Sequence, residues 1–349
     1  MHNNHNGTQN SCRPVRFASL QLRRLAGDWR FLAVIGVIGA VAVVRAWLTP
    51  SQEVLAAEGA QLFVHEWERF DELSGGGDGL GPVFNARSCV ACHHQGGVGG
   101  AGGNQHNVRA FETLPTTTAP QPACGVVHAD AIAGIGRETT ERISELFPIV
   151  KGGQRVISGC TINVADFNPV VFHEVNTPAL FGVGEIDLIS DWTIRRMQLA
   201  RQARNIAREV QGDFSHTPSG RVRVLADGRI GKFGWKGQFG TLEEFVATAC
   251  AVELGLSNHI RRQDVPHEHC PDADVMPDMT PRQIDALVAY CALLESPCRE
   301  EPAAPQAREA ARLGEAPFAR LGCTDCHVPA VGSVVGVYRA FCLYSIVGH

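Results

Sequence analysis

Cys89-Val90-Ala91-Cys92-His93 and Cys323-Thr324-Asp325-Cys326-His327 are the two stretches that decide how this chain of 349 residues folds. In each, two cysteines stand three positions apart and a histidine follows the second cysteine directly. On one helical turn this spacing brings both thiols and the imidazole to the same side. Covalent haem attachment requires two thiols that form thioethers and one imidazole that ligates the iron. The sequence therefore predicts two covalent haem c groups, with His93 and His327 as metal ligands.

Two other kinds of site use paired cysteines, and the sequence argues against both. A zinc site needs a second pair of ligands close by. A thioredoxin-like redox pair needs a βαβ context. Neither accompanies the two motifs, so we interpret Cys89, Cys92, Cys323 and Cys326 as cofactor-binding residues.

Helices are expected before both motifs and after the first one. Residues 53–73 carry an apolar stripe near helical spacing, and residues 307–321 repeat this pattern before the second motif. Thr280-Pro281-Arg282-Gln283 has the form of a capping box with proline at the first helical position. Apolar residues then recur on one helical face, which predicts a closing helix at 280–295.

The expected fold is mainly α, with two cytochrome c-like domains, long loops and one N-terminal membrane segment. The first haem c domain takes residues 52–300 with a large insertion, in which residues 221–235 predict a small β-hairpin. The second takes residues 305–349. Only 22 residues (328–349) follow its motif, where a cytochrome c domain needs several tens more. We expect the second haem site to be incomplete and the helix before it to be unpacked, as in a C-terminally truncated chain.

The composition indicates an exported globular protein. Hydrophobic residues make up 44% of the chain and charged residues 19%, which is ordinary for a folded protein. The net charge of −5 and the lack of a long basic run argue against nucleic acid as a partner. Twelve cysteines suit an oxidising compartment. Cys124 and Cys160 are the first choice for a disulfide, and four others allow three pairings, namely Cys250, Cys270, Cys291 and Cys298.

The first 48 residues predict membrane targeting. Residues 1–30 contain five arginines and one acid, and an unbroken apolar run from Phe31 to Val44 follows. A basic segment before an apolar one keeps the N-terminus in the cytoplasm and sends the rest across the membrane. We expect a periplasmic protein that residues 31–48 anchor in the inner membrane. A cleaved signal peptide is the alternative.

Four further stretches carry a family resemblance. They are Asp78–Cys89, Asn176–Gly184, Gly231–Lys236 and Gly322–Pro329. In combination they resemble the di-haem oxidoreductase family, also called thiol-oxidoreductase-like, which is related to bacterial di-haem cytochrome c peroxidases. The resemblance covers about residues 55–335. It implies two facing haems, one relaying electrons and the other reducing peroxide or oxidising a substrate, with a redox partner such as a small cytochrome.

The remaining site residues are open between alternatives. Met276 resembles the methionine ligand of monohaem cytochromes c and is one candidate for the sixth ligand of the first iron. An open position is another, and a histidine is a third, from among His106, His128, His173, His216, His259, His267 and His269. Trp235 either bridges the haems within the cofactor site or packs in the core. Glu185 is a candidate catalytic base or a surface carboxylate.

The function expected from these features is that of a periplasmic di-haem c-type oxidoreductase, peroxidase-like, that moves electrons between its two haems. One alternative is an electron-transfer cytochrome without catalytic activity, in which both irons keep six ligands. The other is a truncated, inactive fragment. The substrate cannot be read from the sequence.

Overall fold

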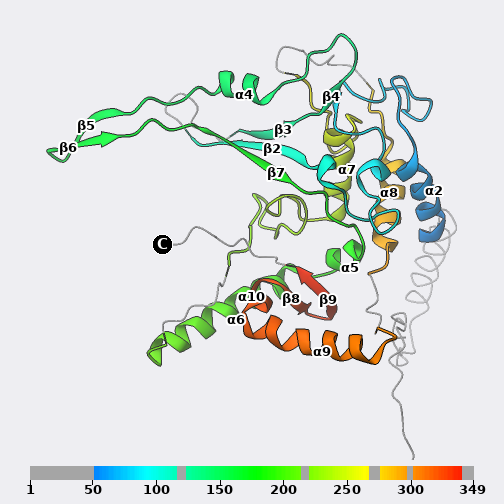
Figure 1. The fold of residues 1–349 in the computed structure, drawn as a ribbon. Coiled ribbons are helices and arrows are strands. Elements are labelled where there is room, and N and C mark those ends of the chain that lie inside the picture. The colour runs from blue at the N-terminus through cyan, green and yellow to red at the C-terminus, as the bar shows by residue number, and fades with distance from the viewer. Residues whose placement is uncertain (1–50, 116–122, 214–219, 267–275, 297–301, 340–349) are drawn as a thin grey trace, which may run out of the picture. The chain divides into compact units, whose positions relative to one another are not determined.

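The computed structural model describes five stretches of the chain (Figure 1): residues 51–115, 123–213, 220–266, 276–296 and 302–339. The predicted cytoplasmic segment 1–30 and membrane segment 31–48 lie outside these stretches. Within them, no helix combines the length and the hydropathy that a membrane crossing requires.

The expectation of a mainly α fold is wrong. The structure is about 37% helical and 18% strand, and its strands form several separate sheets. The helices are α2 (Gln52–Val64), α3 (Cys89–Cys92), α4 (Thr140–Leu146), α5 (Val183–Asp187), α6 (Asp191–Val210), α7 (Leu242–Glu253), α8 (Pro281–Leu293), α9 (Pro305–Arg320) and α10 (Cys323–Cys326), with a 3-10 turn at Asn104–His106. The strands are β1 (Val83–Phe84), β2 (Val108–Thr113), β3 (Cys124–Val127), β4 (Asp130–Ala131), β5 (Gly153–Ile157), β6 (Cys160–Val164), β7 (Val170–Val175), β8 (Val328–Val331) and β9 (Val334–Arg339).

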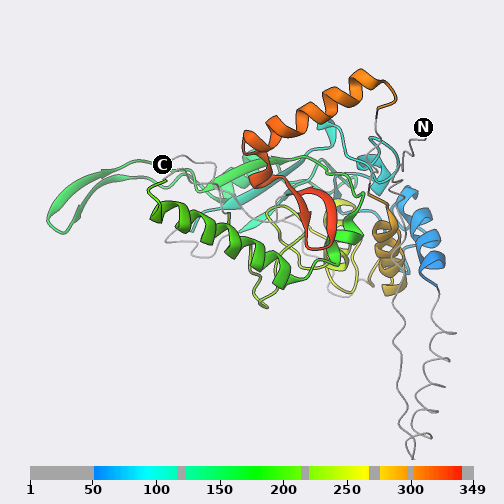
Figure 2. The same cartoon turned by 90° about the horizontal axis from the view of Figure 1, so that it is seen from below.

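Most of the unexpected strands lie between residues 108 and 175. Here β2 pairs with β3 on one side and with β7 on the other, both antiparallel. Strands β5 and β6 form a hairpin whose two loop residues, Ser158 and Gly159, both have positive φ, as a type I′ turn requires (Figure 2). The hairpin predicted at 221–235 is reduced to one antiparallel bridge between Val224 and Ile230.

The predicted helices around the first motif are present. Helix α8 begins where the capping box predicts, since the side chains of Thr280 and Gln283 each bond to the other residue's backbone. Helix α2 is shorter than predicted because the backbone turns extended at His65. The two helices cross closely at Gly59, where an added Cβ would lie 2.0 Å from the carbonyl oxygen of Ala286.

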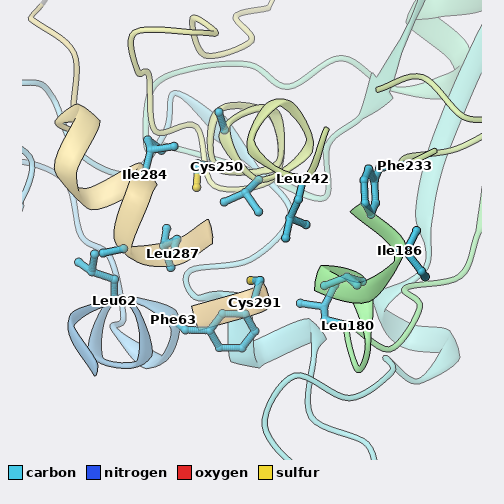
Figure 3. Packing of buried hydrophobic residues seen from close by; sticks show 14 of the residues in the cluster. Leu62, Phe63, Leu180, Ile186, Phe233, Leu242, Cys250, Ile284, Leu287 and Cys291 are labelled. Carbon is cyan, nitrogen blue, oxygen red and sulfur yellow. The ribbon is translucent and has the colours of Figure 1, made fainter. Parts of the chain in front are cut away.

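The core lies between these helices and α7. Figure 3 shows Leu62 and Phe63 of α2 facing Ile284, Leu287 and Cys291 of α8, with Cys250 of α7 behind them. The rings of Phe63 and Tyr290 lie 5.1 Å apart. The packed helices α2 and α8 therefore lie beside the first motif.

The C-terminal segment folds differently from the expectation of an unpacked tail. Directly after the second motif, β8 and β9 form an antiparallel hairpin. Val331 of this hairpin is 2% exposed and belongs to the same hydrophobic core as α2 and α8. Strand β8 contacts α6 and β9 contacts α5, so at least part of segment 305–349 packs against the preceding chain.

Candidate functional site

The first motif forms a single helical turn with its histidine just beyond it. Cys89 to Cys92 make up α3, and the backbone N–H of His93 donates to the carbonyl of Cys89 at 3.0 Å. Ser88 before the turn is buried and donates through its hydroxyl to a carboxylate oxygen of Glu66 at 2.7 Å. The two cysteines and the histidine therefore have the one-turn arrangement that the sequence predicts.

The orientation of the His93 ring is set by the backbone. Its Nδ1 lies 3.2 Å from the carbonyl oxygen of Gly100, to which it donates in the matching tautomer. Burial lowers the pKa of His93, which favours the neutral imidazole. The ring has a second backbone partner in Pro178. In the tautomer with the proton on Nδ1, the lone pair of the ring is on Nε2. Metal-ligating histidines have this arrangement, with the second nitrogen bonded to a carbonyl or carboxylate.

The glycine-rich loop after the motif supplies that carbonyl. It turns back so that Gln95 pairs with Ala101 in an antiparallel bridge. A Cβ on Gly100 would lie 1.9 Å from the carbonyl oxygen of Gln95, so the turn is this tight only because Gly100 has no side chain. The loop thus positions His93.

Burial favours the protonated form of both thiols of the first motif. Burial raises the pKa of Cys89 to about 12, and burial raises that of Cys92 to about 11. Cys250 and Cys291, two candidates for disulfides in the sequence, are free thiols in the core (Figure 3). Both lie close enough to Cys89 to interact with it electrostatically. Their spacing in sequence gave no signal of this closeness.

The other disulfide expectation is not met. Cys124 and Cys160 are both free and exposed, one in β3 and the other at the start of β6. Cys270 and Cys298 lie outside the described residues.

The second motif repeats the local geometry of the first. Cys323 to Cys326 form α10, and the backbone N–H of His327 donates to the carbonyl of Cys323 at 2.8 Å. A phenylalanine accompanies each histidine at the same ring distance: Phe318 lies 6.2 Å from His327, and Phe63 lies 6.2 Å from His93. His327 is exposed, in contrast to the partly buried His93.

The surroundings of both motifs do not suit a four-ligand metal site. In the described stretches, no group of three or more His, Cys, Asp or Glu side chains is arranged to hold a metal ion. A haem iron differs, because it takes only one or two ligands from the protein. An open hollow of about 370 Å³, lined by residues such as Phe84, Arg87 and Ile132, includes no residue of either motif.

The candidates for a sixth ligand are spread over the structure. Met276 is 62% exposed, whereas Met279 is 1% exposed and packs in the core. Among the histidines, His106 lies nearest to the first motif, with its Nδ1 3.8 Å from the Cys92 sulfur. His128 is buried with its Nε2 2.9 Å from the carbonyl of Val252.

The other histidine candidates lie elsewhere. His259 is exposed, and His173 belongs to strand β7. The remaining three are outside the described residues, namely His216, His267 and His269.

Trp235 lies in a polar cluster on the β2–β7 pair. Its ring is 4.5 Å from that of His173, and the Lys236 ammonium lies over it at 4.1 Å from the ring centroid. Lys236 and His173 both contact Glu112, at 2.9 and 3.2 Å. The hydrogen bond from Lys236 lowers the pKa of Glu112. These contacts explain the position of Trp235 without either haem motif.

Two carboxylates are candidates for a catalytic base, and their surroundings differ. Glu185 is exposed on α5 and accepts a hydrogen bond from the Ser296 hydroxyl at 3.1 Å. Glu253, at the end of α7, was not predicted. Burial raises its pKa to about 7, although Asn85 donates to it at 2.6 Å, and its charge raises the pKa of Cys92. A partly buried carboxyl with a raised pKa beside a motif is a functional-site candidate.

Known proteins offer no guide to this geometry. No family profile, characterised protein or solved structure matches the chain. The resemblance to di-haem oxidoreductases therefore rests on the motif stretches of the sequence.

Proposed function

We propose that the chain binds two haem c groups covalently and works as an exported oxidoreductase of the peroxidase type. The observation that supports the proposal is the fixed imidazole of His93, whose Nδ1 is held by the Gly100 carbonyl directly after the two cysteines of the motif. The same cysteine–cysteine–histidine order and backbone bond recur at Cys323–His327.

The residues of each motif divide the work of binding. Cys89 and Cys92 form the thioethers at the first site, and Cys323 and Cys326 form those at the second. When bound, haem supplies an iron that takes up and releases single electrons and, with one coordination position open, reacts with peroxide. Phe63 beside His93 contributes an apolar surface that excludes water from the first site.

Two observations favour catalysis at the first site over electron transport alone. Met276, one candidate for the sixth ligand, is 62% exposed, which favours an open sixth position on the iron that a small substrate can reach. The raised pKa of Glu253, beside Cys92, supports a role for its carboxyl in the proton transfer that peroxide reduction requires. A small cytochrome is the proposed electron donor, and the proposed location is the periplasm, reached through residues 31–48.

Haem attachment is tested by counting covalent haems. The full chain is produced together with the cytochrome c maturation machinery and analysed by denaturing haem stain and intact mass. Wild type is expected to carry two haems, and Cys92→Ala and Cys326→Ala are each expected to lose attachment at one site. Cys124→Ala, outside both motifs, keeps two. A wild-type protein without covalent haem contradicts the proposal.

Catalysis is tested by hydrogen peroxide turnover with a reduced small cytochrome. Glu253→Gln is expected to lower turnover at least about tenfold, because it cannot exchange the proton. Glu185→Gln, on the exposed face of α5, is the matched control and stays at the wild-type rate. Equal rates for all three proteins, at equal haem content, remove Glu253 from the reaction.

The spin state separates an enzyme from an electron carrier. A high-spin ferric signal in the paramagnetic-resonance spectrum is expected from an iron with an open sixth position. Low-spin signals alone, in every redox state, contradict the peroxidase part of the proposal and leave an electron-transfer cytochrome.

A further inference from the structure

Helix α6 presents an apolar ridge to its outer side. Trp192, Leu199 and Ile206 stand seven residues apart, a spacing that keeps side chains on one helical face. They are 64%, 63% and 60% exposed. Leu188 just before the helix and Val210 at its end extend the ridge, at 85% and 83% exposure.

The inner side of the same helix is apolar near its start, at Ile194 and Met197, and polar further along. Arg201 is 7% exposed and Asn205 is half-buried, while Ile194 supplies the fully buried apolar contact near the start. A surface helix of a soluble protein normally has its apolar side toward the core. The second half of α6 instead buries Arg201 and exposes Ile206 and Val210, which indicates that its outer face has an apolar neighbour of its own.

Positive charge borders the ridge. Arg195 and Arg196 are exposed on the two sides of the ridge, and Arg204 is exposed further round the helix. Arg195 donates to the carbonyl of Gly228 at 2.9 Å, and the Arg196 guanidinium lies 5.1 Å from the centroid of the Trp192 ring. The helix has five arginines and two acids, a net charge of +3 in a chain whose net charge is −5. One of the acids, Asp191, points to the protein, where its carboxylate accepts from the N–H of Ile230 at 2.8 Å.

We propose that the outer face of α6 lies in the interface of an anionic phospholipid bilayer. A helix of low mean hydropathy that combines tryptophan and aliphatic residues on one face with arginines along its borders binds such interfaces. The arginines complement phospholipid headgroups of negative charge. A second copy of α6 would instead bring Arg195, Arg196 and Arg204 against like charges, which disfavours pairing of two copies through this face.

The test measures amide hydrogen exchange in α6 of the full chain. Because the full chain includes residues 1–50, which are expected to reach the membrane themselves, vesicle binding alone is no readout. The protein is reconstituted in vesicles of phosphatidylglycerol and phosphatidylcholine, in phosphatidylcholine vesicles and in detergent. Exchange in residues 191–210 is expected to slow severalfold in the anionic vesicles, with α8 unchanged as an internal reference.

Two variants with the same charge change provide the control. Arg196→Glu, on the border of the ridge, is expected to abolish the slowing, whereas Arg155→Glu, exposed on β5, keeps it. Equal exchange in all three preparations overturns the proposal. So does slowing that appears in detergent and grows with protein concentration, which assigns the ridge to a second copy. The readout does not involve haem, so its result is separate from that of the proposed function.

Discussion

At the scale of single residues, Asp278 shows how one buried charge holds distant segments together. It is 0% exposed, and its carboxylate accepts from the N–H of Gly79 at 2.8 Å and from the N–H and hydroxyl of Ser257 at 2.7 and 2.6 Å. These bonds fasten the segment before the first motif to the segment before α8. Burial nevertheless raises the pKa of Asp278 to about 6, because three donors do not replace the lost water.

This pKa predicts that folding stability falls as the pH rises. An acid whose pKa is higher in the folded state than its ordinary 3.8 contributes stability below that value. The contribution is lost as the pH rises through about 6, and it amounts to at most about 3 kcal/mol. Urea unfolding of wild type and Asp278→Asn is measured between pH 4 and 7.5. As the pH rises, the free energy of unfolding is expected to fall less in the variant than in wild type.

The comparison with a variant isolates this one group. Buried Glu253, with its raised pKa, acts in the same direction, whereas the lowered pKa of His93 and His128 acts in the opposite one. All three remain in Asp278→Asn and cancel in the difference. Asp285→Asn, exposed on α8, should follow the wild-type curve. Parallel curves for both variants would show that Asp278 titrates alike in the folded and unfolded chain.

The sequence predicted the residues of the haem motif better than it predicted the residues that surround them. The one-turn spacing of Cys89, Cys92 and His93 is present in the structure because it is a property of local helix geometry. The Gly100 carbonyl and the closeness of Cys250 to Cys89 were not predicted. Both depend on how the backbone returns from elsewhere, which no local spacing encodes.

At the scale of elements, helix boundaries were predictable where a cap marks them. The capping box at Thr280 places the start of α8, and the one formed by Thr241 and Glu244 begins α7. The strands between 108 and 175 were not predicted, because they are short and because β7 lies far along the chain from its partner β2. Exposed pairs such as Arg155 and Ile162 in β5 and β6 lack the one-sided burial that produces an alternating pattern.

The crossing of α2 and α8 yields a second prediction, from two helical glycines. Gly59→Ala is expected to lower the free energy of unfolding by at least about 2 kcal/mol, because its Cβ would clash with Ala286. Gly314→Ala in α9 meets no atom within 4 Å and is expected to raise it by up to about 1 kcal/mol through helix propensity. Urea unfolding checks both. Equal changes in the free energy of unfolding for the two variants would mean that α2 and α8 can move apart without a loss of stability.

At the scale of the whole molecule, the C-terminal segment differs from the rest of the described chain in how much of it packs against the core. The sequence predicted a separate, unpacked second domain from residue 305 onward. The structure instead gives this segment two unlike parts. None of the described side chains of α9 is buried, whereas Val331 in β8 reaches the common core. The packing of Val331 could not be predicted from the residues after the second motif, because its partners in the core are far away in the sequence.

The third prediction separates these two parts by proteolysis. Trypsin is expected to cut the full chain first at Arg308 and Arg320, which are exposed on α9. Cleavage at Arg282 in α8 should be slower, because α8 packs against α2. The fragment that contains β8 and β9 should still co-elute with the body of the protein under native conditions, since Val331 holds it there. Val331→Asp buries a charge and should release the fragment. Ser333→Asp, an equal charge on an exposed position of the same hairpin, should not. A fragment that separates from the wild-type body directly after cleavage would show that the hairpin contributes no binding of its own, and that segment 305–339 is attached only through the chain.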